Sequence, residues 1–217
     1  MLARLAFLPA VVLLGVGCGC SQKSGENADG DGNGVSNPPS SRPRDYSRKI
    51  DATFSFPAEA SVGDWVEKKF TESQGKTYVE RLAVVGKEAS GALWIEQTDT
   101  RTVPGHEIVR RLLVQPDGRV VEGWIGYAGE KGEALELVPA GPTDPGEPDE
   151  VGQAKVQVPA GTFEANVESY VYDEDVVKIY RSPEVPYDRV VKREEPDYIA
   201  ELTRFSKDAK PTLEPGK

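Results

Sequence analysis

The body of the chain is a series of short runs in which apolar and polar residues alternate. Residues 92–100 show this most clearly, because Leu93 and Ile95 fall on one side of an extended chain and Trp94 and Glu96 on the other. Alternation with a period of two is typical of strands that bury one face. Such runs recur about every 8–12 residues, as expected for an antiparallel all-β domain. The predicted strands are residues 64–70, 77–85, 92–100, 107–115, 119–127, 134–138, 156–158, 162–172, 176–182, 190–192 and 198–205.

Turn residues separate these runs and indicate how they connect. Residues 73–75 (Ser-Gln-Gly) and 116–118 (Pro-Asp-Gly) each join two strand-like runs, and glycine accepts the positive φ that such turns require. Residues 139–152 hold four prolines, which cannot donate ladder hydrogen bonds, so we expect them to split the sheet into two halves. Only residues 58–62 and 110–113 could form helix instead, because no long segment repeats its apolar residues with the helical period of 3.6.

The N-terminus is typical of a secretory signal. A short basic start is followed by an apolar run at residues 5–16, which is shorter than the roughly 20 residues of a membrane-spanning helix. Residues 14–18 (LGVGC) then resemble a bacterial lipobox. The resemblance implies cleavage before Cys18 and attachment of a diacylglycerol and an acyl group such as palmitate. Cys20 is a second, poorer candidate, and an ordinary secretory signal is the alternative interpretation.

The residues after Cys18 indicate a lipid-anchored domain on a tether. Residues 18–48 are rich in Gly, Ser, Asn, Pro and charge and offer little apolar surface to bury. We therefore expect a signal peptide at 1–17, a lipidated tether at 18–48, one β domain at 49–213 and a tail at 214–217. Gly19 follows Cys18, which by analogy with lipoprotein sorting favours the outer membrane, facing the periplasm or the cell surface.

Composition excludes several kinds of function. The formal net charge of -10 argues against nucleic acid as a partner. Both cysteines lie within the first twenty residues and His106 is the only histidine, so we expect no metal, no cofactor and no catalytic residue. His106 follows a turn signal and is expected to be exposed. Four acidic residues between 144 and 150 match no calcium-binding loop spacing, so a solvated loop is expected there.

The second half carries three motifs in order: residues 158–163 (VPAGTF), 182–186 (SPEVP) and a final strand containing Glu201-Leu202. Together with the opening at residues 62–66, they resemble uncharacterised bacterial envelope proteins. The resemblance implies a curved antiparallel sheet forming an open half-barrel, like that of Lol-type periplasmic lipoprotein carriers, and it supplies no catalytic residues. The chain departs from the pattern at residues 187–189, where a glycine-rich turn is usual.

Two functional hypotheses follow. The first is a non-enzymatic envelope lipoprotein whose concave sheet holds a lipid or an acyl chain, with Trp65, Trp94 and Trp124 as candidates for lining an apolar groove; packing in the core is the other interpretation of these residues. The second is a scaffolding lipoprotein that contacts protein partners without a small ligand. A hydrolase using paired carboxylates is a third, weaker alternative, since any two of 36 acidic residues could be paired by chance.

Overall fold

The computed structural model describes residues 47–100, 107–139, 146–172 and 175–216. The predicted signal peptide, Cys18 and the predicted tether up to residue 46 lie outside these residues, as does His106. The described residues fall within one unit, Tyr46–Lys217. Within them, no helix has the length and hydrophobicity needed to cross a membrane.

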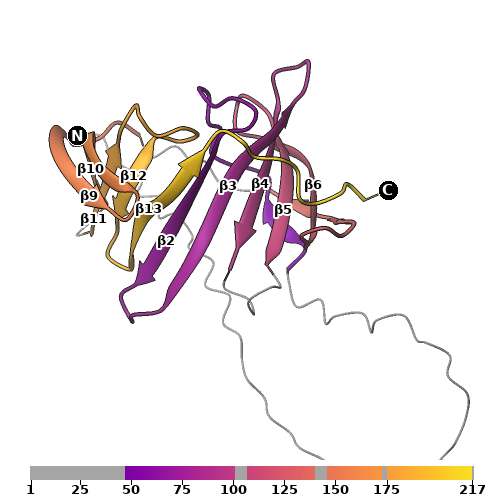
Figure 1. Ribbon diagram of the computed structural model, residues 1–217, viewed down its shortest axis with the longest axis horizontal. Helices are drawn as coiled ribbons and strands as arrows, with labels where there is room; N and C mark the ends of the chain where they lie inside the picture. Colours follow the sequence, from indigo (N-terminus) through magenta and orange to yellow (C-terminus); the bar gives the residue numbers. More distant parts are fainter. Residues whose placement is uncertain (1–46, 101–106, 140–145, 173–174, 217) are drawn as a thin grey trace, which may run out of the picture. The chain divides into compact units, whose positions relative to one another are not determined.

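Every regular element in the described residues is a β-strand, which confirms the all-β prediction (Figure 1). Residues 110–113, an alternative for helix, lie inside the fifth strand. The strands are β1 (Lys49–Asp51), β2 (Trp65–Glu72), β3 (Thr77–Lys87), β4 (Leu93–Asp99), β5 (Ile108–Val114), β6 (Val120–Tyr127), β7 (Glu133–Ala134), β8 (Glu136–Val138), β9 (Glu150–Val158), β10 (Gly161–Tyr172), β11 (Asp175–Arg181), β12 (Val190–Glu194) and β13 (Tyr198–Ser206).

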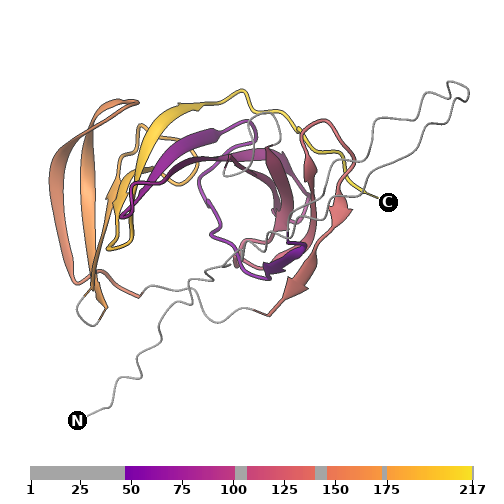
Figure 2. The same cartoon turned by 90° about the horizontal axis from the view of Figure 1, so that it is seen from below.

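Eleven of these strands form a single antiparallel sheet in the order β7-β6-β5-β4-β3-β2-β13-β12-β11-β10-β9. Its two edge strands, β7 and β9, do not pair with each other, so the sheet is curved but open, as predicted (Figure 2). The two halves expected on either side of residues 139–152 meet where β2 pairs with β13. A separate parallel pair joins β1 to β8.

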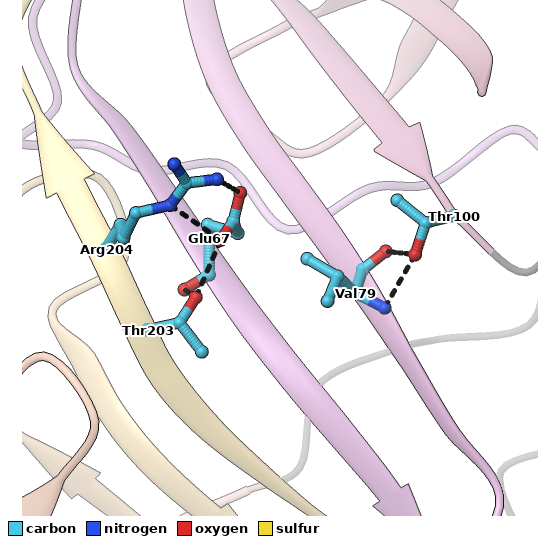
Figure 3. A network of polar contacts seen from close by, with 5 residues as sticks. All are labelled: Glu67, Val79, Thr100, Thr203 and Arg204. Atoms are coloured by element: carbon cyan, nitrogen blue, oxygen red, sulfur yellow. Dashed lines mark hydrogen bonds and ion pairs between the residues drawn. The ribbon is translucent and has the colours of Figure 1, made fainter. Parts of the chain in front are cut away.

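The junction between the halves is fixed by Glu67 of β2 (Figure 3). Arg204 of β13 donates hydrogen bonds to both of its carboxylate oxygens, at 2.9 and 2.6 Å, and the Thr203 hydroxyl donates a third at 2.9 Å. The register of the two strands shifts between Leu202 and Arg204, which places Thr203 in a β-bulge. Burial alone would raise the pKa of Glu67, but these hydrogen bonds outweigh it and the net pKa is lowered.

The main core draws on both halves of the sheet, and in the N-terminal half it lies on the concave side. Cross-strand neighbours Val84, Ile95 and Leu112 are fully buried there. The segment that precedes β2 runs inside the curl, and its Ile50 and Phe54 pack against this core (Figure 2). The chain's own residues therefore fill the apolar part of the concave face; Phe56, Ala60, Leu82, Leu135 and Leu137 complete the packing on this side of the sheet.

The convex side of the same half is covered by the C-terminal segment, which follows the outside of the curl (Figure 2). Leu213 is buried against Trp124, Trp94 and Val109. Because Ile95 faces the concave core while Trp94 faces this second cluster, the alternation predicted for residues 92–100 is confirmed.

Candidate functional site

One loop, residues 182–189 between β11 and β12, combines unusual backbone geometry with unpartnered buried oxygens. We call this loop the proline-rich corner. It contains two successive turns, in which the Val185 N–H donates to the Ser182 carbonyl and the Arg189 N–H to the Pro186 carbonyl. A hydrogen bond from the Ser182 N–H to the Arg189 carbonyl, at 2.9 Å, closes the loop. Pro183 is at the second position of its turn, where its fixed φ is favourable.

The corner holds the two described non-glycine residues with positive φ, Tyr187 at 66° and Arg189 at 61°. Each left-handed residue costs about 1–2 kcal/mol unless it is glycine. Neither position carries a glycine, the residue that adopts this conformation without a steric cost. Strain of this kind persists only where neighbouring contacts impose it, and it is frequent at functional sites.

Several contacts hold the strained residues. Tyr187 is buried in the main core, and Asp188 forms an ion pair with Lys68 of β2. A carboxylate oxygen of Asp188 accepts a hydrogen bond from the Val190 N–H at 3.0 Å, and its carbonyl accepts one from Arg181 at 2.8 Å. The corner is therefore anchored on both the sheet and its flanking strands.

Lys68 belongs to a polar band on the concave face, beyond the apolar core. The band consists of Lys68, Glu80, Gln97, Asp99 and Arg110, which lie on four adjacent strands. Within it, Gln97 donates a hydrogen bond to Glu80 at 2.6 Å. The part of the concave face that Ile50 and Phe54 cover is therefore apolar, and the part beyond it is polar.

Two buried polar atoms of the corner, Oγ of Ser182 and Oη of Tyr187, have no hydrogen-bond partner among the described residues. A third such atom is Oδ1 of Asp64, which lines the pocket beside the corner, and these three are half of the six in the described part of the chain. Buried polar groups are nearly always hydrogen-bonded in native proteins, so this concentration requires an explanation. Burial raises the pKa of the Tyr187 hydroxyl well above its usual range, and the charges of Asp188 and Glu80 raise it further, so the hydroxyl stays protonated.

A pocket of about 160 Å³ is lined by residues of the corner and of the segment that precedes β2. Three of its side chains are carboxylates and two are cations, and one of the cations, Arg189, is already paired with Glu59. The lining residues are Glu59, Ser61, Asp64, Pro183, Glu184, Val185, Pro186, Tyr187, Arg189 and Lys207.

A second hollow, of about 300 Å³, lies over β11 and β12 and is lined by Val176, Lys178, Glu194, Glu195 and Pro196. The nearby polar groups are partnered: Tyr180 donates to Glu194 at 2.9 Å, and Lys192 lies 2.8 Å from the same carboxylate. Burial, followed by the bond to Glu194, raises the pKa of Tyr180 to about 12.

The three tryptophans that were candidates for groove lining do not form one site. Trp94 and Trp124 lie together, with ring centroids 5.2 Å apart, beneath the C-terminal segment. Trp65 lies apart from them, donating a hydrogen bond to Asp208 at 2.8 Å, with Arg81 over its ring at 4.5 Å.

The remaining sequence-derived candidates are Cys18, His106 and the acidic loop. Cys18 and His106 lie outside the described residues, as does Asp144 of the acidic loop. In the same loop, Asp149 accepts a hydrogen bond from the Val171 N–H at 2.8 Å. Within the described ranges, no three Asp, Glu, His or Cys side chains are placed to hold a metal ion.

Sequence reasoning missed Asp64, Lys68 and Tyr187 as members of one site. The sequence showed that residues 187–189 lack glycine, but this gave no indication of the loop's backbone geometry or of its contacts. Asp64 is more than a hundred residues away along the chain, and only the tertiary fold brings it to the corner.

Comparisons with known proteins give no family. No protein-family model matches the chain, and no curated protein matches it. Among solved structures, a candidate lipoprotein from Parabacteroides distasonis aligns with 15% identity and a TM-score of 0.34. The alignment covers 72% of this chain and the whole of that one. The fold and the site described above therefore rest on the residues of this chain alone.

Proposed function

We propose that the chain is a bacterial envelope lipoprotein, anchored through Cys18, with a non-enzymatic binding role exercised at the proline-rich corner. The observation that carries the binding role is a loop with two left-handed residues and two unpartnered buried oxygens, next to a pocket that Asp64, with a third unpartnered buried oxygen, also lines. A loop that served only to connect two strands would gain stability from glycine at its left-handed positions and from partners for its buried oxygens.

The packed concave face favours this proposal over carriage of an acyl chain. A Lol-type carrier would need an apolar space inside the sheet, and here Ile50, Phe54 and Leu137 pack against the core at that position. An acyl chain could enter only by displacing these residues at the cost of their burial, roughly 1.5–3 kcal/mol for each large side chain. We expect native mass spectrometry of the gently purified protein to detect the covalent anchor and no further bound lipid.

The anchor is tested by Cys18→Ala, with Cys20→Ala as the matched control. A diacylglycerol together with an N-acyl group supplies more than the two anchoring signals that stable membrane binding requires. We expect Cys18→Ala to lose both fatty-acid labelling and membrane association, while Cys20→Ala keeps both. Retention of label by Cys18→Ala, or its loss in Cys20→Ala, would move the anchor to the second cysteine. Separation of inner and outer membranes would test the expected outer-membrane location.

The binding role is tested by photo-cross-linking in whole cells, with a photoreactive residue in place of Glu184 at the corner. We expect a discrete cross-linked species from this position and none from Asp117, an exposed turn residue on the other half of the sheet. A corner that cross-links to nothing, at several lining positions, would remove the proposal.

A protein-contacting scaffold is the second candidate function, and exposed valines on the C-terminal hairpins favour it. Val171 and Val176 are cross-strand neighbours on β10 and β11, 51% and 46% exposed, and Val151 on the edge strand β9 is 71% exposed. Cross-linking from these strands, rather than from the corner, would support the scaffold.

A further inference from the structure

The eleven-stranded sheet has one long free edge. At one end of the sheet, β7 is only two residues long, and Lys131, just before it, forms a β-bridge with Glu214 of the C-terminal segment. At the other end, β9 has nine residues and pairs only with β10 among the described strands (Figure 1). An edge strand presents a row of backbone N–H and C=O groups that can pair with another chain.

The accessible part of this edge is the beginning of β9. At the end of the strand, Val156 is buried in the main core, and the Ala160 N–H in the following turn donates a hydrogen bond to the Leu202 carbonyl at 3.1 Å. Residues 150–155, in contrast, are exposed apart from Ala154, which is half-buried. This stretch offers about 20 Å of extended chain to a partner.

The edge lacks the features by which proteins protect free strands, which include prolines, bulges and lysines. The strand contains no proline, and its pairing with β10 runs along its whole length without a shift of register. Its one lysine, Lys155, lies 3.9 Å from the carboxylate of Glu164 on β10, so its charge is offset. The edge is therefore available to an incoming strand.

Both faces of this edge have room for the side chains of an added strand. On one face, Val151 is 71% exposed, and because it lies opposite Glu168 it shares that face with the aromatic ring of Tyr170. On the other face, a Cβ placed on Gly152 would meet no atom within 4 Å, beside the half-buried Val167. An added strand would cover the exposed valine and fill this open space.

The charges around the edge indicate which partner fits. Glu147, Asp149 and Glu150 are exposed at the beginning of β9. A second copy of the chain is disfavoured, because each copy carries a formal net charge of -10 and the two would repel each other. A strand that carries lysine or arginine has the complementary charge.

We propose that residues 150–155 of β9 accept an extended basic segment of a partner protein, which joins the sheet as a further strand. Backbone hydrogen bonds supply the affinity in this mode of binding, and alternate side chains supply the specificity. An apolar side chain of the segment covers Val151, and its lysines or arginines lie beside Glu150. The inference specifies the partner of the scaffold role, which is the second candidate function above, and does not depend on the proline-rich corner.

The experiment is fluorescence anisotropy with the full lipidated chain in a non-ionic detergent. The probe is a labelled, capped peptide as long as β9, in which lysine alternates with valine or threonine. One control peptide has the same sequence with N-methyl groups on its central backbone nitrogens, which keeps the charge and removes the hydrogen-bond donors. A second control has glutamate in place of every lysine.

We expect the basic peptide to bind with a dissociation constant on the order of 100 μM or tighter, and each control peptide to bind at least about tenfold more weakly. Failure of the basic peptide to bind overturns the inference. Equal binding of the N-methylated peptide would show attraction by charge without strand addition, and equal binding of the acidic peptide would exclude the acidic edge as the cause. Either result also overturns the inference.

Two pairs of variants locate the site on β9. Val151→Lys places a cation on the edge and is expected to weaken binding of the basic peptide at least about tenfold, whereas Val121→Lys, at an exposed position on β6, has no effect. Glu150→Gln is expected to weaken binding severalfold, and Glu122→Gln, exposed on β6, is its matched control. Unchanged affinity in Val151→Lys, or an equal loss in Val121→Lys, would contradict the inference.

Two further measurements keep the result interpretable. Thermal melting reports whether each variant is folded, and if Val151→Lys does not fold, Gln153→Lys on the same face of β9 replaces it with the same expected loss. Amide hydrogen exchange should show new protection within residues 150–155 when the basic peptide binds, and protection confined to other strands would overturn the inference.

The edge and the proline-rich corner can fail separately. Peptide binding at β9 without any cross-link from the corner would remove the proposed role of the corner and leave the edge standing. Cross-linking from Glu184 by a protein that binds no basic peptide would overturn the edge alone.

Discussion

Two carboxylates of this domain, Glu96 and Asp64, are almost equally buried, at 3% and 5% exposed, and yet they differ in their partners. Glu96 lies on the convex face and accepts four hydrogen bonds from Thr212 and Leu213, at 2.8–3.1 Å. Asp64 lies beside the proline-rich corner and accepts one. Glu96 is thus fully hydrogen-bonded and fixes the C-terminal segment, whereas the buried Oδ1 of Asp64 has no partner among the described residues.

At equal burial, the number of hydrogen bonds decides whether a carboxylate stabilises the fold. A buried carboxylate with all its acceptor positions used stabilises the segment that donates to it. A buried carboxylate with an unused oxygen costs free energy until a donor arrives.

The largest effect is expected from Glu96→Ala. The change leaves the Thr212 and Leu213 N–H groups without their acceptor and frees the C-terminal segment, so we expect the free energy of unfolding to fall by about 4 kcal/mol. For a domain of this size, that corresponds to a decrease in Tm of roughly 10 °C, measurable by circular dichroism. Glu164→Ala, at a mostly exposed position on β10, serves as the control and is expected to change stability by no more than about 0.5 kcal/mol.

Truncation of the Leu213 side chain tests the apolar contacts between the C-terminal segment and the convex face of the sheet. Leu213 is 1% exposed and packs against Trp94 and Trp124, so Leu213→Ala is expected to cost about 3 kcal/mol through lost burial and a cavity. Tryptophan fluorescence should shift to the red as water reaches the two rings. A shift without loss of stability would mean that the C-terminal segment covers the tryptophans without stabilising the sheet. Val121→Ala, at an exposed position on β6, is the control.

Features set by neighbours in sequence were predicted, and contacts between distant residues were not. The alternation around Ile95 predicted the strand and its two faces, and the Pro-Asp-Gly turn was recovered with Gly118 at a φ of 83°. These features depend on neighbours in sequence. The contact between Glu96 and Thr212 spans 116 residues, and the meeting of Asp64 with the corner depends on the pairing of β2 with β13. Local patterns carry no information about such pairs, so the sequence left both groove lining and core packing open for Trp94, which lies in a packed cluster in the structure.

Asp64→Asn tests how the incompletely hydrogen-bonded carboxylate affects the free energy of unfolding. Asn keeps an oxygen that can accept the Ser61 N–H, and it removes a buried charge that has no ion-pair partner. We therefore expect unchanged stability or a gain of up to about 1 kcal/mol in urea unfolding without ligand. Glu96→Gln is the matched comparison, since it also replaces a buried carboxylate by an amide, and it should destabilise by about 2 kcal/mol. Equal losses in the two variants would show that Asp64 is as fully partnered as Glu96.

The smallest effect concerns Glu67, a third carboxylate that is partly exposed and well hydrogen-bonded. Its pKa in the folded protein is lowered from 4.5, because hydrogen bonds from Arg204 and Thr203 outweigh the opposing effect of burial. A lowered folded pKa means that the contribution to stability is present above pH 4.5 and is lost as the pH falls through the folded pKa. The difference in stability between wild type and Glu67→Gln should therefore shrink between about pH 6 and about pH 3. Because Arg204 is largely exposed, added salt should reduce the difference at the higher pH. The effect of Glu96→Gln should not respond to salt, because the donors to Glu96 are neutral groups of Thr212 and Leu213.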